Sequence, residues 1–270
     1  MTPSKPQGAV RFKLNRRKVL VTLILGSLLQ FVHAGFSTSA FTQGFAEEQK
    51  KAMEKIIRDY LLKNPTIIRD ALDALRVQEE EQKQKEVAKR IRSRSRDLQN
   101  DPSAPVLGNS NGDITVVEFF DYNCGYCKRS FPVLKALIES DRSIRLVMKE
   151  FAILGPNSVT MAKAALAAKK QGKYLELHRE FMHGDQFEEK MLEGIAKKVG
   201  LDYQKLLEDM KDPGIAQSLQ KNYQLAEDLG INGTPAFIIG DNLIPGAIGL
   251  DALKKLISDA RSKPKTPSRQ

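Results

Sequence analysis

The sequence predicts an α/β domain that carries a helical insertion and follows an N-terminal helical arm. An apolar, β-branched and aromatic run, ITVVEFF at residues 114–120, is typical of a buried strand. Four or five segments with helical periodicity occupy residues 155–230, and a strand pattern returns in PAFIIG at 235–240. Ahead of the domain, apolar residues recur at spacings of three and four between residues 46 and 75, which predicts amphipathic helices.

The net charge of the chain is concentrated at its two ends. Of the 43 Lys and Arg residues, ten lie in residues 1–20 and 261–270, where there is no Asp or Glu. The remaining 33 basic residues balance the 33 acidic residues, so the body of the protein is neutral. The formal charge of +10 therefore gives little support to nucleic acid as a partner, and we expect none.

Residues 1–34 have the three parts of a secretory signal peptide. A basic stretch is followed by 14 mostly apolar residues, VLVTLILGSLLQFV at 19–32, with small residues at Val32 and Ala34. A membrane anchor is the alternative, but a span needs about 20 apolar residues, and this run is shorter and interrupted by polar ones. We therefore expect cleavage after Ala34 or Ala40 and export to the periplasm, by the general secretory or the twin-arginine route. Disulfides persist in that compartment.

Residues 35–100 form the expected helical arm and linker. The amphipathic segments within 46–63 and 65–75 are too small to build a core of their own, so we expect them to bury their apolar faces by self-association. No apolar residue occurs from Gln78 to Glu86, and this stretch is expected to be a solvated helix or a linker. An interaction protein whose function resides in the arm is one alternative for the whole chain.

The domain is expected to span residues 101–262 and to be followed by a basic tail at 263–270. DPSAPVLGNSNGD at 101–113 is rich in Pro, Gly, Asn and Asp, which marks a domain boundary. The predicted order is strand, helix, strand, helical block, strand, strand and helix. The second strand candidate is IRLVMKEFAIL at 144–154, and the helical block is the insertion at about 155–230.

Both cysteines of the chain, Cys124 and Cys127, follow the first predicted strand. A bridge between them closes too small a loop to stabilise the fold by much. Structural zinc needs four ligands, and His178 and His183 lie some fifty residues away at a spacing that does not bring ligands together on a helix face. We therefore expect neither a metal site nor a cofactor. Soft thiolates suit Cu(I), so a Cu(I)-binding module is a further alternative.

The position of Cys124 favours redox chemistry. It lies where a strand ends and a helix begins, and the free N–H groups of a first helical turn favour a thiolate over a thiol. Cys124 is then the nucleophile, and Cys127, one turn further on, is the thiol that resolves the mixed disulfide. Gly125 and Tyr126 lie between the two cysteines and control access to the sulfur atoms.

Three features together point to a known family: EFFDYNCGYC at 118–127, Thr234–Pro235 before a strand, and the helical block. From the residues alone, Pro235 either follows a cis peptide bond or simply starts a strand. The three features resemble the active-site motif, the cis-proline loop and the helical insertion of the DsbA-like thiol–disulfide oxidoreductases of the thioredoxin superfamily. The resemblance covers about residues 105–260 and implies a thioredoxin fold with an inserted helical domain.

The resemblance also implies a role for each site residue. Cys124 is the exposed attacking cysteine and Cys127 is the buried one. Thr234 and Pro235 form the loop, with Pro235 cis, that pairs with the substrate backbone. Glu118 matches a buried acid of the family that helps to move a proton to or from Cys127. The alternative for Glu118 is an edge or solvent-facing position, because Glu is rarely buried.

Two features bear on the direction of the reaction. Strongly oxidising members of the family have His where this chain has Tyr126, so we expect a weaker oxidant. The helices ahead of the domain, with IIRDYLLKNPTIIRDAL at 56–72, resemble the ScsC-type subgroup, in which some members are trimers that act as isomerases. The resemblance implies an oxidoreductase that forms or reshuffles disulfides in cysteine-containing secreted proteins, as an isomerase if oligomeric or as a dithiol oxidase if monomeric. A membrane redox partner is expected to oxidise or reduce its CxxC motif.

Overall fold

The computed structural model describes residues 46–184 and 186–262. The expected signal peptide at 1–34 and the expected basic tail at 263–270 lie outside the described residues. Within the described part of the chain, no helix has the length and apolar character needed to cross a membrane.

The first of two units, residues 1–63, contains helix α1 (Glu47–Lys63). None of the residues of α1 is buried. The large apolar side chains that it exposes are Met53, Ile56, Ile57, Tyr60 and Leu62. Because a short helix gains most of its stability by packing an apolar face, α1 has the surface of a helix that needs a partner.

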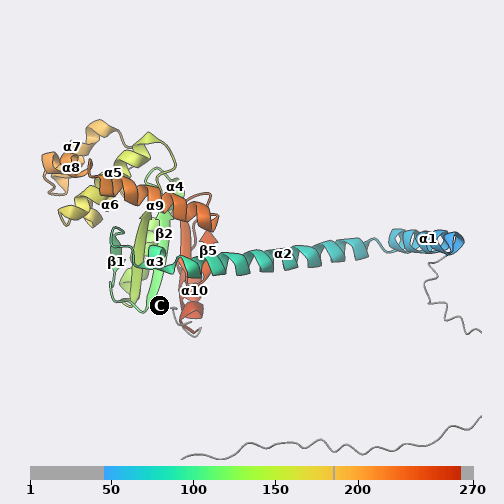
Figure 1. The fold of residues 1–270 in the computed structure, drawn as a ribbon. Coiled ribbons are helices and arrows are strands. Elements are labelled where there is room, and N and C mark those ends of the chain that lie inside the picture. The colour runs from blue at the N-terminus through green and yellow to red at the C-terminus, as the bar shows by residue number, and fades with distance from the viewer. Residues whose placement is uncertain (1–45, 185, 263–270) are drawn as a thin grey trace, which may run out of the picture. The chain divides into compact units, whose positions relative to one another are not determined.

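The second unit, residues 64–270, is built on one five-stranded sheet with helices on both faces (Figure 1). The strand order is β1-β3-β2-β4-β5, in which β2 and β3 are parallel and the other neighbours are antiparallel. The strands are β1 (Val106–Gly108), β2 (Ile114–Phe120), β3 (Ile144–Glu150), β4 (Ala236–Ile239) and β5 (Asn242–Pro245). The predicted α/β class is confirmed.

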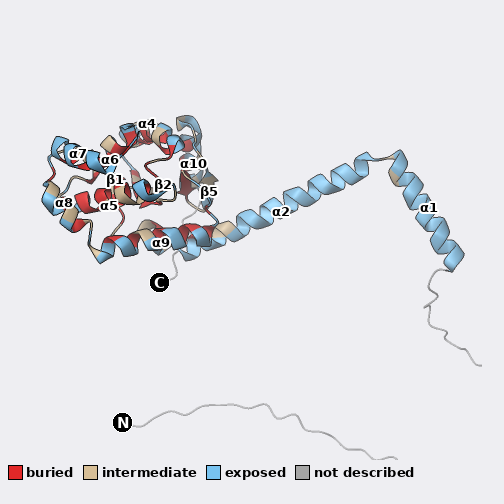
Figure 2. Ribbon diagram, turned by 90° about the horizontal axis from the view of Figure 1, so that it is seen from above, coloured by how far each residue is buried: buried red, intermediate tan, exposed pale blue. Residues whose placement is uncertain are grey.

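Helices bury both faces of the sheet, as Figures 1 and 2 show. On one face lie α4 (Gly125–Ser140) and α10 (Leu250–Ser262). On the other lie the end of α2 (Thr66–Ser93), α3 (Ser95–Gln99) and α9 (Pro213–Leu229). Successive side chains of a strand point to opposite faces, and both faces of β2 are covered, so its sequence is an uninterrupted apolar run apart from Thr115 and Glu118.

The expected helical insertion is confirmed. It contains α5 (Pro156–Lys170), α6 (Tyr174–His183), the 3-10 turn η1 (Glu189–Met191), α7 (Leu192–Lys198) and α8 (Tyr203–Asp209), and it returns to the sheet through α9. Figure 1 shows α5 to α8 gathered to one side of the sheet. Their apolar side chains join the core under α4, so the insertion and the sheet share one core.

The end of α2 is anchored on the sheet, whereas the rest of the helix is not. Every residue from Pro65 to Glu86 is exposed, which Figure 2 shows as a pale blue helix. Ile91 and, in α3, Leu98 are buried in the core under α9. Residues 87–100, which the sequence assigns to the arm and linker, therefore pack with the domain.

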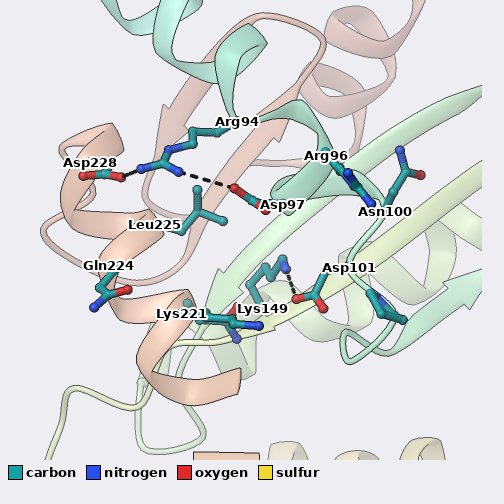
Figure 3. A pocket seen from close by; sticks show the side chains of 12 residues that line it. Arg94, Arg96, Asp97, Asn100, Asp101, Lys149, Lys221, Gln224, Leu225 and Asp228 are labelled. Carbon is teal, nitrogen blue, oxygen red and sulfur yellow. Dashed lines mark hydrogen bonds and ion pairs between the residues drawn. The ribbon is translucent and has the colours of Figure 1, made fainter. Parts of the chain in front are cut away.

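Ion pairs hold the segment after α2 in place around a pocket of about 360 Å³ (Figure 3). Arg94 pairs with Asp228 of α9 and with Asp97. Lys149 of β3, which is 1% exposed, pairs with Asp101 at 2.7 Å. Burial lowers the pKa of Lys149, and the hydrogen bond to Asp101 opposes that effect. A buried ammonium group needs such a partner, so this pair fastens the start of the domain to the sheet.

Candidate active site

Cys124 caps the helix that begins directly after it. The chain leaves β2 at Phe120, turns through residues 121–123 and enters α4 at Gly125. Cys124 has an extended backbone (φ −80°, ψ 111°), and its sulfur accepts the backbone N–H of Cys127 at 3.3 Å. The first turn of a helix presents unpaired N–H groups and a partial positive charge, so the position favours a negatively charged sulfur.

The surroundings of the Cys124 sulfur stabilise its thiolate. A hydrogen bond with the Cys127 thiol is the main cause, and hydrogen bonds from the Thr234 side chain and from two backbone N–H groups add to it. Burial acts in the opposite direction, and the resulting pKa of Cys124 is about 5. At neutral pH the sulfur is therefore in the form that attacks disulfides.

The two cysteines differ in their environment. Cys124 is 6% exposed and Cys127 is not exposed at all, and both are free thiols. Cys124 is thus less exposed than the family resemblance implies, because the Thr234 loop lies against it, but it is the more accessible of the two. Burial raises the pKa of Cys127 far above its ordinary value, and the hydrogen bond to Cys124 and the charge of Glu118 act in the same direction.

Glu118 lies on the face of β2 that packs against α4. Val116 and Phe120, two residues away on either side, belong to the core on that face. Glu118 is 1% exposed, which excludes a solvent-facing position, and its Oε1 has no hydrogen-bond partner among the described residues. Burial, followed by the charge of Cys124, raises the pKa of Glu118 to about 8. This carboxyl group can therefore exchange a proton near neutral pH.

The Thr234–Pro235 peptide bond is cis. β4 begins at the next residue, Ala236, which pairs with Phe119 of β2, so the loop lies beside the end of β2. The Cys124 thiol donates a hydrogen bond to the Thr234 carbonyl oxygen at 3.1 Å. The fold thus brings together two segments that are 110 residues apart in the chain.

Gly125 and Tyr126 form the exposed start of α4. Tyr126 is 60% exposed, and the guanidinium carbon of Arg129 lies 4.3 Å from the centroid of its ring. Tyr126 also borders a groove of about 420 Å³ next to the cis-proline loop. The groove is further lined by Ile231, Thr234, Pro235, Leu243 and Pro245.

A family model for the DSBA-like thioredoxin domain matches residues 115–258. The match covers more than half of the chain and contains both cysteines, Glu118 and the cis-proline loop. The chain belongs to the DsbA-like thioredoxin family. A second model, for the N-terminal domain of the copper resistance protein ScsC, matches residues 49–82. This DsbA-like protein therefore carries ScsC-type helices ahead of its domain.

Solved structures resemble this chain over 63–82% of its length. A thioredoxin-like oxidoreductase from Silicibacter pomeroyi is 44% identical and covers 63% of this chain and 98% of that one, with a TM-score of 0.61. A linker-deletion variant of Proteus mirabilis ScsC is 28% identical. The match covers 82% of this chain and 99% of the ScsC variant, with a TM-score of 0.60. A periplasmic thioredoxin-like protein from Salmonella enterica serovar Typhimurium is 31% identical. The match covers 63% of this chain and 96% of the Salmonella protein, with a TM-score of 0.58.

Curated relatives share only a part of their length with this chain. The Na⁺/H⁺ antiporter NhaA 3 of Salinispora tropica is 27% identical over 158 residues, which are 57% of this chain and 24% of the antiporter. The chain thus spans about a quarter of the length of the first curated relatives that it matches.

Behind this DsbA-like site lies a buried polar cluster that the sequence does not predict. Glu150, at the end of β3, accepts hydrogen bonds from the hydroxyl groups of Tyr122 and Tyr174, each at 3.0 Å. The Tyr122 hydroxyl also pairs with Nδ1 of His178 at 2.9 Å. All four residues are buried, and burial raises the pKa of Glu150 and lowers that of His178 to about 3. The only signal in the sequence is an acidic residue within the apolar run IRLVMKEF.

Asp121 holds the loop that leads to Cys124. Its carboxylate accepts the backbone N–H groups of Ile153 and Leu154 at 2.8 and 2.9 Å, and the hydroxyl of Ser158 at 2.7 Å. These bonds draw the chain away from the sheet after Glu150. β3 covers Ile144–Glu150 and not the expected range of 144–154, because its partner β2 ends at Phe120, opposite Glu150.

His178 and His183, the two histidines considered as metal ligands, form hydrogen bonds with groups other than the two cysteines. His178 belongs to the buried cluster, and Nδ1 of His183 lies 2.8 Å from the Arg179 carbonyl oxygen on its own helix. In the part of the chain that the structure describes, no group of three or more His, Cys, Asp or Glu side chains is arranged to hold a metal ion.

Proposed function

We propose that this chain is an exported thiol–disulfide oxidoreductase that forms or reshuffles disulfides in other secreted proteins. The supporting observation is the contrast between its two cysteines. The Cys124 sulfur has a pKa of about 5, whereas burial raises the pKa of Cys127 far above its ordinary value. A pair of this kind suits disulfide exchange, because one sulfur attacks while the other stays protonated until it resolves the intermediate.

In the proposed reaction, the Cys124 thiolate attacks one sulfur of a substrate disulfide. The substrate S–S bond breaks, a mixed disulfide forms, and the second substrate sulfur leaves as a thiolate. In isomerisation, that thiolate or another substrate thiolate attacks the mixed disulfide and releases Cys124. In reduction, Cys127 passes its proton to Glu118 and attacks Cys124, which releases the substrate as a thiolate. Oxidation of a substrate dithiol is the reverse sequence, and throughout, the Thr234–Pro235 loop pairs with the substrate backbone.

The two sulfur atoms carry the electrons, so the proposed reaction uses neither a metal nor an organic cofactor. The CxxC motif needs a membrane redox partner to restore it. That partner removes electrons from an oxidase and supplies them to an isomerase, which must stay reduced. Cysteine-containing secreted proteins are the proposed substrates.

We propose a periplasmic location, supported by the signal-peptide pattern at 1–34 and by the periplasmic relative from Salmonella. Mass spectrometry of the protein from a periplasmic extract should find an N-terminus at residue 35 or 41. A protein that retains residue 1 and stays with the membrane fraction would contradict cleavage and favour an anchor.

The arm supports a further proposal, that the chain is a homo-oligomer, specifically a trimer, which acts as an isomerase. In addition to the apolar side chains of α1, the start of α2 exposes Ile67, Ile68, Leu72, Leu75 and Val77. Burying one such side chain stabilises an assembly by roughly 1.5–3 kcal/mol. An oligomer holds several Cys124 sites around one substrate, which raises their effective concentration for reshuffling. The ScsC-type match over 49–82 supports this assignment of the arm.

Refolding of ribonuclease tests both proposals. We expect the mature protein to reactivate scrambled ribonuclease, and a variant with Ile56, Ile57 and Tyr60 replaced by Gln to be monomeric by light scattering. That variant should still oxidise reduced ribonuclease but should not reactivate the scrambled form. The matched control is Lys51→Gln/Lys55→Gln, which by helical spacing alters the opposite face of α1.

The outcomes separate the two proposals. A wild-type protein without activity on either form of ribonuclease would contradict the oxidoreductase function. An arm variant that keeps full isomerase activity would contradict the role of the arm and leave the dithiol chemistry intact. Oxidase activity alone, from a monomeric wild-type protein, would favour a dithiol oxidase.

The copper resistance protein named in the second family match favours one other candidate function, the binding of Cu(I) by Cys124 and Cys127. Soft thiolates select Cu(I), and Cys124 is a thiolate at neutral pH. Competition with a chromogenic Cu(I) chelator, for the reduced protein and a Cys124→Ser variant, measures this affinity. Tight binding without activity on ribonuclease would support a copper module, and equal binding by both proteins would contradict it.

A further inference from the structure

An arginine side chain lies over the dipeptide between the two cysteines. The guanidinium carbon of Arg129 is 4.3 Å from the centroid of the Tyr126 ring, which is the geometry of a cation–π contact. Nη1 of Arg129 is also only 3.5 Å from the position that a Cβ atom on Gly125 would occupy. Arg129 therefore folds back along α4 and places its charge at the rim of the active site.

This charge is available to a ligand. Arg129 and Tyr126 are both exposed, and among the described residues no carboxylate forms an ion pair with Arg129. A guanidinium group that rests on an aromatic face keeps its N–H donors at the edge of its plane, where they can bind a carboxylate in a bidentate manner. The contact with Tyr126 restricts the side chain before a ligand arrives, which reduces the entropy lost on binding.

On the side of the cis-proline loop, the described residues present no acidic side chain next to Tyr126. The groove beside the cis-proline loop, which Tyr126 borders, has no charged residue in its lining. The two nearest acidic residues in sequence, Glu118 and Asp121, are each 1% exposed. Lys128 adds a second positive charge at the start of α4 and donates to the Gly184 carbonyl oxygen. A peptide that approaches Cys124 along this groove therefore meets an apolar surface with the Arg129 guanidinium group at its edge.

We propose that Tyr126 and Arg129 form a carboxylate-recognition element, so that the protein reacts fastest with cysteines that have Asp or Glu beside them in the substrate. This inference rests on the proposed oxidoreductase function and names the substrate class that the site prefers. The aromatic ring positions the guanidinium group, and the guanidinium group binds the acidic side chain while the neighbouring apolar groove takes up the peptide.

The test uses three peptides in which the residues on both sides of one cysteine are Glu, Gln or Lys, each carried as a mixed disulfide with 2-thiopyridine. The Cys124 thiolate attacks the peptide sulfur, the S–S bond to the pyridine breaks, and 2-thiopyridone leaves with a proton and is followed by its absorbance. Cys127 then passes its proton to Glu118 and attacks Cys124, which releases the peptide thiolate and leaves the Cys124–Cys127 disulfide. Each rate is divided by the rate of the same peptide with dithiothreitol, which removes differences in intrinsic reactivity.

We expect the Glu peptide to react about threefold faster than the Gln peptide and about tenfold faster than the Lys peptide at low salt. These differences should vanish at about 1 M salt, where the screening length falls to about 3 Å. Arg129→Gln should abolish the differences, and Tyr126→Leu should reduce them. Arg142→Gln is the matched control, because this exposed arginine follows the far end of α4, about 24 Å along the helix, and should leave the differences in place.

The possible results are distinct. Equal rates for the three peptides with the wild-type protein would overturn the inference and leave the oxidoreductase function standing. If Arg129→Gln slows all three peptides equally, Arg129 acts on the reactivity of the Cys124 thiolate and not on the substrate. That result would also overturn the recognition of carboxylates. No release of 2-thiopyridone with any peptide would contradict the proposed function itself.

Discussion

The Cys124 sulfur lies 3.1 Å from the Thr234 carbonyl oxygen, and the peptide bond that follows Thr234 is cis. The thiol is the donor in this contact, so the contact exists only while Cys124 is protonated. When Cys124 becomes a thiolate it accepts hydrogen bonds instead, and the Thr234 carbonyl oxygen is released. We expect that oxygen then to accept a backbone N–H from a substrate strand next to the reacting sulfur.

Cys124 is expected to be alkylated by iodoacetamide at acidic pH. Its pKa is about 5, so the thiolate fraction rises as the pH increases through that value, and the rate should become constant above about pH 6. Mass spectrometry of samples quenched between about pH 3 and about pH 8 measures this rate. In a Cys124→Ser variant, buried Cys127 should remain unmodified over the same range. A rate that still increases above about pH 7 would indicate an ordinary thiol.

Replacing Glu118 by Gln is expected to slow the step in which Cys127 resolves the mixed disulfide. The pKa of Glu118 is raised to about 8, so its basic form increases as the pH rises through 8, and the rate of resolution should follow it. Loss of a general base costs on the order of 100-fold in rate, and Glu118→Gln should also lose this pH dependence. Single-turnover measurement of peptide thiol release reports the step.

The attack by Cys124 in the same reaction serves as an internal control for Glu118→Gln, because it precedes the proton transfer. A resolution rate that is unchanged in the variant would remove Glu118 from the proposed mechanism.

Tyr126→His is expected to make the protein a stronger oxidant. An imidazolium group at this exposed first turn stabilises the Cys124 thiolate and hence the reduced form. We expect the equilibrium with glutathione to move towards the reduced protein by about tenfold, which corresponds to about 30 mV. Tyr126→Phe should leave the equilibrium nearly unchanged. A wild-type potential close to about −120 mV, typical of a strong oxidant, would contradict the expectation of a weaker one.

Asp101→Asn is expected to destabilise the domain by about 3 kcal/mol, because it leaves the buried ammonium group of Lys149 without its partner. Denaturant unfolding of the reduced protein measures the loss. The double variant Asp101→Asn/Lys149→Met should recover most of it. Arg92→Gln breaks a half-exposed pair with Asp241 and should cost less than about 1 kcal/mol. If Asp101→Asn costs no more than Arg92→Gln, the buried pair does not anchor the segment.

Parts of the fold follow from local sequence and parts do not. β2 is predictable because burial on both faces requires a continuous apolar run, whereas β1 is a three-residue strand whose hydrogen bonds are supplied by β3. Ile91 is a single apolar residue in the basic run KRIRSRSR, so no periodicity indicates its burial. Two of the acidic partners of that run, Asp228 and Asp241, come from distant parts of the chain.

The sequence by itself determined the DsbA-like family, the helical insertion and the position of Cys124 at a junction between strand and helix. Local patterns suffice for the insertion and for the position of Cys124, because hydrophobic periodicity and helix capping act over a few residues. The family follows from the resemblance of the CxxC motif and the Thr234–Pro235 pair to those of known proteins. Only the tertiary structure decided that Glu118 is buried, that Thr234 lies against the sulfur, and that Arg129 covers Tyr126. The pKa of a group and the charge that a substrate meets depend on burial and on neighbours from distant segments, which are set only when the chain has folded.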